Sequence, residues 1–196
     1  MEGSKIRLSP SEMDLVTDAS VILTKNNIIR KATALLQEVQ EAVYQPSPIQ
    51  AALRKQPKIS KGENYLGLPY VVLDYPRLSE GTDLFFIRSF FWWGNFFSST
   101  LQVSGSWKDR SLAPIAAAYT NLAAADYYVG CHADPWQHHF EEGNYRKIGG
   151  LSEGAFHTVL EEQVHIKIAA RWPLEEWNLA ANRLVESWNL LLDLIP

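Results

Sequence analysis

The sequence predicts an α+β domain in which a largely antiparallel sheet packs with N-terminal, middle and C-terminal helices. Helical spacing of apolar residues marks both ends of the 196-residue chain, and short apolar runs separated by glycine and proline fill its middle. The connections between the predicted strands are too short to hold a helix after every strand, which argues against a parallel sheet. No repeat or break in composition divides the chain, so we expect one domain over residues 1–196.

The composition and charge of the chain argue against several classes of protein. Hydrophobic residues make up 46% of the chain and charged residues 20%, as in ordinary globular proteins. The net charge of -4 argues against a nucleic-acid partner, because phosphate binding normally needs a basic excess. Polar residues interrupt the richest apolar stretch, so no membrane span is expected. A single cysteine, Cys131, and a start without a signal-peptide segment predict a cytoplasmic location.

The first elements are N-terminal helices at about 10–44. Ser9 is the expected N-cap, and Glu12 is placed to complete a capping box with it. This helix should run to about Leu23, and either Asn26 or Asn27 should cap the second one. Apolar residues at three- and four-residue spacing then predict that the second helix has one buried face.

Strands are expected over about 57–105, where one segment is unusually aromatic. Eight aromatic residues fall within the thirteen positions 85–97. A strand with one face in water would not carry so many, so this segment is either buried on both faces or presents one face to a ligand or partner.

The dipeptide Gly94-Asn95 suggests how this segment folds. As the two-residue loop of a β-hairpin, it would place Trp93 opposite Phe96 and Arg88 opposite Leu101. Arg88 would then lie on an apolar face, and Ser98, Thr100 and Gln102 would belong to the other, amphipathic face. That second face would either be covered by a helix or form the floor of a pocket.

The remaining elements follow from similar patterns. A helix is expected at about 111–125, strands and loops at about 126–172, and a C-terminal helix at about 174–195. Alternation from Val164 to Trp172 predicts a strand with one face in the core. The other face, which carries His165, Lys167 and Arg171, is expected to be solvated.

Two groups of residues are candidates for chemistry. The segment with His132, Asp134, His138 and His139 has side chains suited to acid-base catalysis, and a tight turn at Asp134 would bring His132 and His138 together as metal ligands. Neither HExxH nor paired CxxC is present, so a polar loop without metal is the alternative. Cys131 is expected to be a buried, inert thiol.

Arg88 is the second candidate because a guanidinium among aromatic side chains needs an anion to offset its desolvation. That anion is either a ligand or a structural partner such as Asp74 or Asp83. The structural pair is the interpretation that we favour.

Three functional hypotheses follow. The first is a binding protein for a small apolar or anionic molecule, with Arg88, Trp93 and His138 near the ligand. The second is an enzyme that uses the cluster at residues 132–139. The third is a homodimer closed by the aromatic hairpin. Nothing in the sequence identifies a cofactor, because neither a nucleotide-binding loop nor a nucleophile motif is present.

Overall fold

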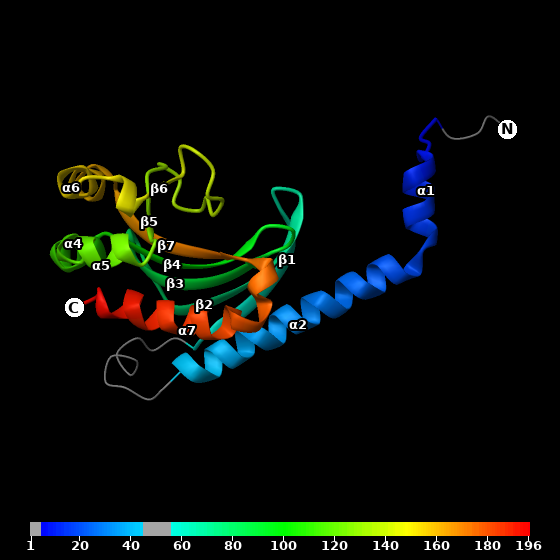
Figure 1. Cartoon of the computed structure of the whole chain (residues 1–196), viewed down its shortest axis with the longest axis horizontal. Coiled ribbons are helices and arrows are strands. Elements are labelled where there is room, and N and C mark those ends of the chain that lie inside the picture. The colour runs from blue at the N-terminus through cyan, green and yellow to red at the C-terminus, as the bar shows by residue number, and fades with distance from the viewer. Residues whose placement is uncertain (1–4, 45–55) are drawn as a thin grey trace.

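The computed structural model describes residues 5–44 and 56–196 and confirms the α+β class. Its seven strands form one antiparallel sheet in the order β1-β2-β3-β4-β7-β5-β6 (Figure 1). The strands are β1 (Lys58–Tyr65), β2 (Leu68–Glu80), β3 (Asp83–Trp92), β4 (Phe96–Ser104), β5 (Tyr128–Gly130), β6 (Tyr145–Lys147) and β7 (His165–Pro173).

Helices cover one face of this sheet, and a long loop covers part of the other. In Figure 1, α2 and α7 run beneath the sheet, while the loop at residues 131–144, here called the covering loop, lies on the opposite side. None of the helices within residues 5–44 and 56–196 is long and apolar enough to cross a membrane. The helices are α1 (Pro10–Thr17), α2 (Ala19–Val43), α4 (Ser106–Ala117), α5 (Tyr119–Ala124), α6 (Glu153–Glu162) and α7 (Trp177–Asp193).

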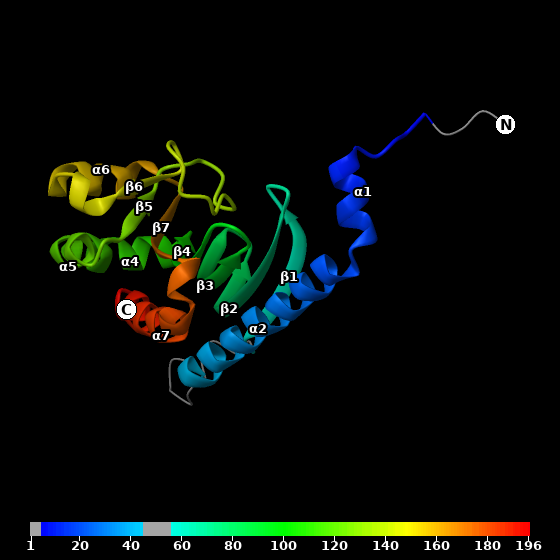
Figure 2. The same cartoon turned by 45° about the vertical axis from the view of Figure 1, so that its right-hand side comes forward.

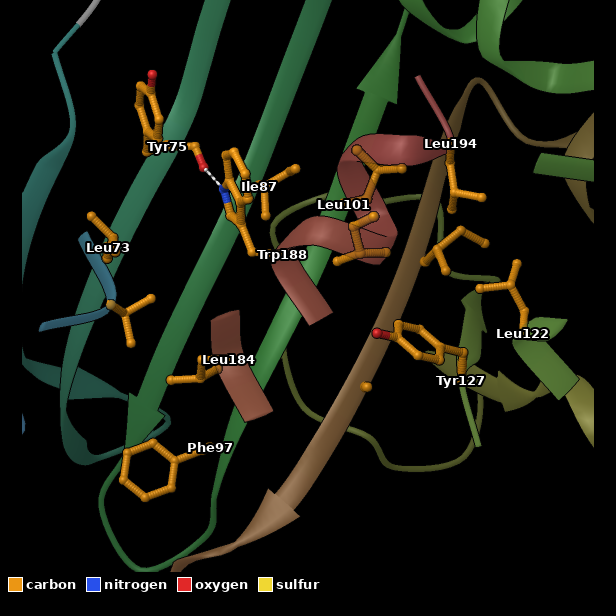
Figure 3. Close-up of a cluster of buried hydrophobic side chains, with 14 of the residues drawn as sticks. Leu73, Tyr75, Ile87, Phe97, Leu101, Leu122, Tyr127, Leu184, Trp188 and Leu194 are labelled. Atoms are coloured by element: carbon orange, nitrogen blue, oxygen red, sulfur yellow. Dashed lines mark hydrogen bonds between the residues drawn. The ribbon is translucent and has the colours of Figure 1, made fainter. Parts of the chain in front are cut away.

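The main core lies between the sheet and the helices. Leu101 of β4 and Leu184 of α7 are both fully buried there (Figure 3). The indole of Trp188 stacks on Tyr75 and donates to the Tyr75 backbone carbonyl at 2.6 Å. Burial of so many apolar side chains is the main source of stability for this fold.

The aromatic hairpin forms, but its predicted register is wrong by one residue. Trp92 lies opposite Phe96 and Arg88 opposite Thr100, because three residues rather than two form the loop. The Asn95 amide donates to the Trp92 carbonyl at 3.1 Å, and Gly94 takes a positive φ of 69° in this turn. A shift of one residue moves every side chain of β4 to the other face. Arg88 therefore shares its face with the polar residues of β4, not with Leu101.

The N-terminal and middle helices were predicted with the right type but imprecise bounds. The capping box between Ser9 and Glu12 is present, yet α1 already ends at Thr17. Asp18 is the N-cap of α2, so the prediction of Asn26 or Asn27 is wrong. The middle helix begins at Ser106, directly after Gly105, and is followed by a second short helix.

Two further expectations are wrong between β5 and β7. A helix, α6, occupies part of the segment expected to hold only strands and loops, and its N-cap Ser152 accepts from the Ala155 amide at 3.2 Å. His165 and Lys167 do point away from the helices, but they are 4% and 1% exposed, not solvated. The covering loop excludes water from this part of β7, where Lys167 donates to the Gln137 carbonyl, whereas Arg171 on the same face is exposed as predicted.

Candidate functional site

A pocket of about 380 Å³ opens on the face of the sheet that lacks helices. Its floor comes from β1, β2 and β3, and the covering loop forms one wall. Aromatic rings and four charged side chains line it. The lining residues are Lys58, Ser60, Tyr65, Tyr70, Val72, Asp74, Arg77, Phe86, Arg88, Phe90, Trp136 and His138. This cavity, here called the aromatic pocket, has the size of a small-molecule site and is lined by aromatic rings and polar side chains.

Arg88 is the centre of the polar contacts in this pocket. It lies directly opposite Asp74 in the register of β2 and β3. Its Nε donates to Asp74 Oδ1 at 2.7 Å, and its Nη2 donates to Asp74 Oδ2 at 2.9 Å. The structure therefore contains the pair between Arg88 and Asp74 that the sequence favoured, in the bidentate geometry that orients both groups.

A third contact joins Arg88 to the covering loop. Its Nη1 lies 2.7 Å from Nε2 of His138. A guanidinium only donates, so the His138 Nε2 must accept, and the imidazole is neutral with its proton on Nδ1. Burial, together with the positive charge of Arg88, lowers the pKa of His138 well below its usual value. His138 thus acts as an uncharged link between the loop and the sheet.

Tyr65 fixes the same part of the loop from β1. Its hydroxyl oxygen accepts from the backbone amides of His138 at 2.6 Å and of His139 at 3.1 Å. Burial raises the pKa of Tyr65, which keeps the phenol protonated. Two sheet residues, Arg88 and Tyr65, therefore hold one short segment of the loop at the edge of the pocket.

Lys167 lies beneath the loop, beyond the pocket wall. Its ammonium nitrogen donates to the Gln137 carbonyl and is 4.7 Å from the ring centre of Tyr145. Burial, with a smaller effect from the charge of Arg88, lowers the pKa of Lys167 to about 7. Complete burial also raises the pKa of Tyr145. The region under the loop is thus shielded from water, which disfavours the charged forms of both side chains.

The structure brings together some of the predicted site residues and separates others. Arg88 and His138 both line the aromatic pocket, but Trp93 packs against the main core on the helix side and is not among the lining residues. His132 accepts from the Asp134 amide at 3.0 Å within the loop, and the His139 Nδ1 is 3.9 Å from Glu141. Within residues 5–44 and 56–196, neither of these contacts involves the side chain of His138, which instead meets Arg88.

The metal hypothesis gains no support from this arrangement. Within residues 5–44 and 56–196, His, Cys, Asp and Glu side chains form no group of three that could hold an ion. Asp134 instead accepts from the Trp136 amide and from the Gln137 side chain, both at 2.9 Å, and so shapes the loop. Those hydrogen bonds, the Trp136 amide first, lower the pKa of Asp134.

Both Cys131 and the aromatic hairpin make contacts within the chain. The thiol of Cys131 donates to the Val129 carbonyl at 3.6 Å, and burial raises its pKa. A raised pKa keeps the thiol protonated and weakly nucleophilic, but Cys131 is half-buried and not fully buried as expected. Strands β3 and β4 lie inside the sheet, and most of their aromatic rings are buried within the chain, which leaves little of this hairpin for a partner.

Several pocket residues were missed by the sequence analysis. Tyr65 and Tyr70 flank the turn between β1 and β2, and Arg77 follows a register shift in β2. Trp136 comes from the loop, and its ring centre lies 5.8 Å from the guanidinium carbon of Arg88. Only the alternation of β2, which gives Tyr70, Val72 and Asp74 one common face, could have indicated part of this set.

Comparisons with protein-family models, with curated proteins and with solved structures find no match to this chain.

Proposed function

We propose that this protein binds a small anionic molecule with a flat apolar body in the aromatic pocket. The observation that carries the proposal is a cationic centre, Arg88, held rigidly between aromatic walls in a pocket of about 380 Å³. Rigid placement lowers the entropy cost of binding, because the protein groups need not be ordered by the ligand.

The charges around the pocket favour an anion. Three cationic side chains, Lys58, Arg77 and Arg88, line it together with one carboxylate, Asp74, and the adjacent His138 is neutral. Among residues 5–44 and 56–196, protein atoms engage three of the five N–H groups of Arg88, so two can donate to a ligand. A carboxylate or a phosphate group is the chemistry that such donors recognise.

The walls favour a flat apolar body. Phe90 lies with its ring centre 5.8 Å from that of Tyr65 and 5.6 Å from that of Tyr70, in tilted or edge-on arrangements. Phe86 packs edge-on against Trp136 at 6.1 Å on another side. Rings in these orientations offer both faces and edges to an aromatic guest.

Binding of three related probes tests this proposal. Sodium benzoate and phenyl phosphate carry an aromatic ring and an anion, whereas benzyl alcohol has the ring without the charge. By ligand-observed NMR titration, we expect one of the anions to bind at least about tenfold more tightly than benzyl alcohol, a difference of about 1.4 kcal/mol. The better anion identifies carboxylate or phosphate as the preferred group.

A matched pair of variants on β1 locates the binding site. Lys58 lines the aromatic pocket, whereas Lys61 is an exposed lysine of the same strand that lines a different cavity. We expect K58Q to weaken anion binding about two- to fivefold, because an exposed charge contributes modestly, and K61Q to leave it unchanged. Equal binding of all three probes, or equal effects of the two variants, would refute the proposal.

A further inference from the structure

The N-terminal arm, residues 5–28, presents an apolar surface that the described part of its own chain does not cover. Every residue from Lys5 to Thr24 is exposed. Figures 1 and 2 show α1 and the first half of α2 leading away from the sheet in both views. Large aliphatic side chains of the arm that are 41% to 68% exposed are Leu8, Met13, Leu15, Val16, Val21, Ile22 and Leu23.

The first helix of the arm is short and has no buried side chain. With eight residues, α1 is shorter than the roughly 12–15 residues that a helix needs to be stable alone in water, and none of its residues is buried. Its capping box and Pro10 favour helix formation locally. An apolar surface on a locally favoured helix is the usual mark of a protein interaction site.

A complementary surface lies where the arm joins the body. A groove of about 610 Å³ runs between α2 and β1, with Ile29 and Ile59 among its walls. Arg30 and Lys61 give it positive charge, while its acidic residue, Glu63, is paired with Lys25. The helix α1 carries Glu12 and Asp14 and no basic residue. Its charge is therefore opposite to that of the groove.

We infer that α1 of a second copy of this chain occupies the groove, in a reciprocal exchange of arms between two subunits. The chain's own α1 leads away from the groove, since only Asp18 separates it from the continuous helix α2. A twofold arrangement buries the arm and the groove of both copies at once.

Charge also favours a second copy over a lipid surface. Membrane-binding amphipathic helices carry Lys and Arg on their polar face, whereas the polar residues of α1 include only acids among their charged members. An acidic helix is repelled by anionic lipids and attracted by Arg30 and Lys61. The partner is thus the chain itself.

Sedimentation equilibrium of the full chain tests this inference. We expect a mass of twice 22.2 kDa at micromolar concentration. The M13D/V16D variant, which places two charges on one face of α1, should raise the dimer dissociation constant at least about a hundredfold, or nearly 3 kcal/mol. Val164 is 84% exposed elsewhere on the molecule, and V164D should leave the dimer unchanged.

A charge exchange shows which surfaces meet. The D14K/T17K variant, which keeps the capping box of Glu12, puts a basic helix against a basic groove, and the R30E/K61E variant puts an acidic helix against an acidic groove, so each alone should be monomeric. Mixing them restores opposite charges at both contacts, and a heterodimer should form. A monomeric wild-type chain, a dimer indifferent to M13D/V16D, a mixture that stays monomeric, or sedimentation of a monomeric chain with phosphatidylserine vesicles would each overturn the inference.

Discussion

The two faces of the sheet are covered by different elements and bury different kinds of side chain. On the helix face, adjacent strands contribute mostly apolar side chains to a continuous core, with Ser89 and Ser99 buried among them, and α2 and α7 close it. On the opposite face, a smaller apolar cluster around Phe90 and Trp92 borders buried polar and charged side chains such as Lys167 and Gln102. The helix face stabilises the fold. On the opposite face, burial of charged side chains lowers stability but holds these charges in fixed positions.

Neighbouring residues of β4 give the sharpest comparison between the faces. Leu101 is fully buried against the helices, and Thr100 is 5% exposed on the other side. We expect L101A to lower the free energy of unfolding by about 3–4 kcal/mol, because it removes buried methyl groups and leaves a cavity. T100V keeps the side-chain size and should cost about 1 kcal/mol. Urea denaturation measures both, and equal costs would contradict the division into two faces.

The ion pair tests how the pocket face holds its charges. R88M leaves Asp74 without its partner and should cost about 3 kcal/mol, since an unpaired carboxylate then stays largely buried. The double variant R88M/D74N removes both charges and should cost less than the sum of the two single variants. Urea denaturation of the four proteins gives the coupling energy as a double-mutant cycle.

Arg77 provides the control for this cycle. It lines the same pocket, and its Nε donates to the Gln56 carbonyl at 3.1 Å, but it forms no ion pair with a carboxylate of residues 5–44 and 56–196. R77M should therefore cost less than about 1 kcal/mol. Additive costs of R88M and D74N would mean that the two groups do not stabilise one another.

Period-two patterns identified the strands but could not tell how each face is covered. The alternation of β7 correctly separates Ile166 and Ile168 from His165 and Lys167. A strand pattern records only which residues share a side, so the covering loop over Lys167, which comes from residues 131–144, left no signal in β7 itself. The prediction of a solvated face is therefore wrong for His165 and Lys167 and correct for Arg171.

Loop length explains the error in the hairpin. Gly94-Asn95 satisfies the preference of a two-residue loop as well as that of the three-residue loop that forms. The choice depends on packing across the sheet, where Arg88 must meet Asp74 on β2 while Thr100 and Ala169 continue the same row on β4 and β7. Because this row joins strands that are far apart in sequence, the sequence of the hairpin alone could not predict it.

Only those site residues that have unusual neighbours in the sequence were predicted. Arg88 and His138 were identified because a cation among aromatic residues and a histidine pair are unusual in themselves. Tyr65 was missed because nothing near it in sequence marks its hydroxyl as the acceptor for two loop amides. The helix α6 had a usable signal, since Phe156, Val159 and Leu160 are buried at helical spacing, but the nearby glycines suggested a loop.

The pH dependence of the free energy of unfolding tests whether His165 is shielded from water on the face opposite the helices. Burial, with added repulsion from Lys167, lowers the pKa of His165 to about 4, whereas an unfolded histidine titrates near 6.5. The unfolded chain therefore binds more protons than the folded one between these values, and stability falls as pH decreases from about 6.5 to 4. Asp134, Lys108 and His132 also influence this group, and His138 contributes in the same direction.

We expect H165Q to lose about 2 kcal/mol less stability than the wild type between pH 7 and pH 4, as measured by urea denaturation at each pH. At pH 8 the imidazole is neutral in both states, so the difference between the two proteins there gives the effect of packing alone. A parallel loss in both proteins on acidification would show that His165 stays protonatable in the folded state. The polar face would then admit water at β7, and the contrast with the dry helix face would be weaker than the burial of Lys167 implies.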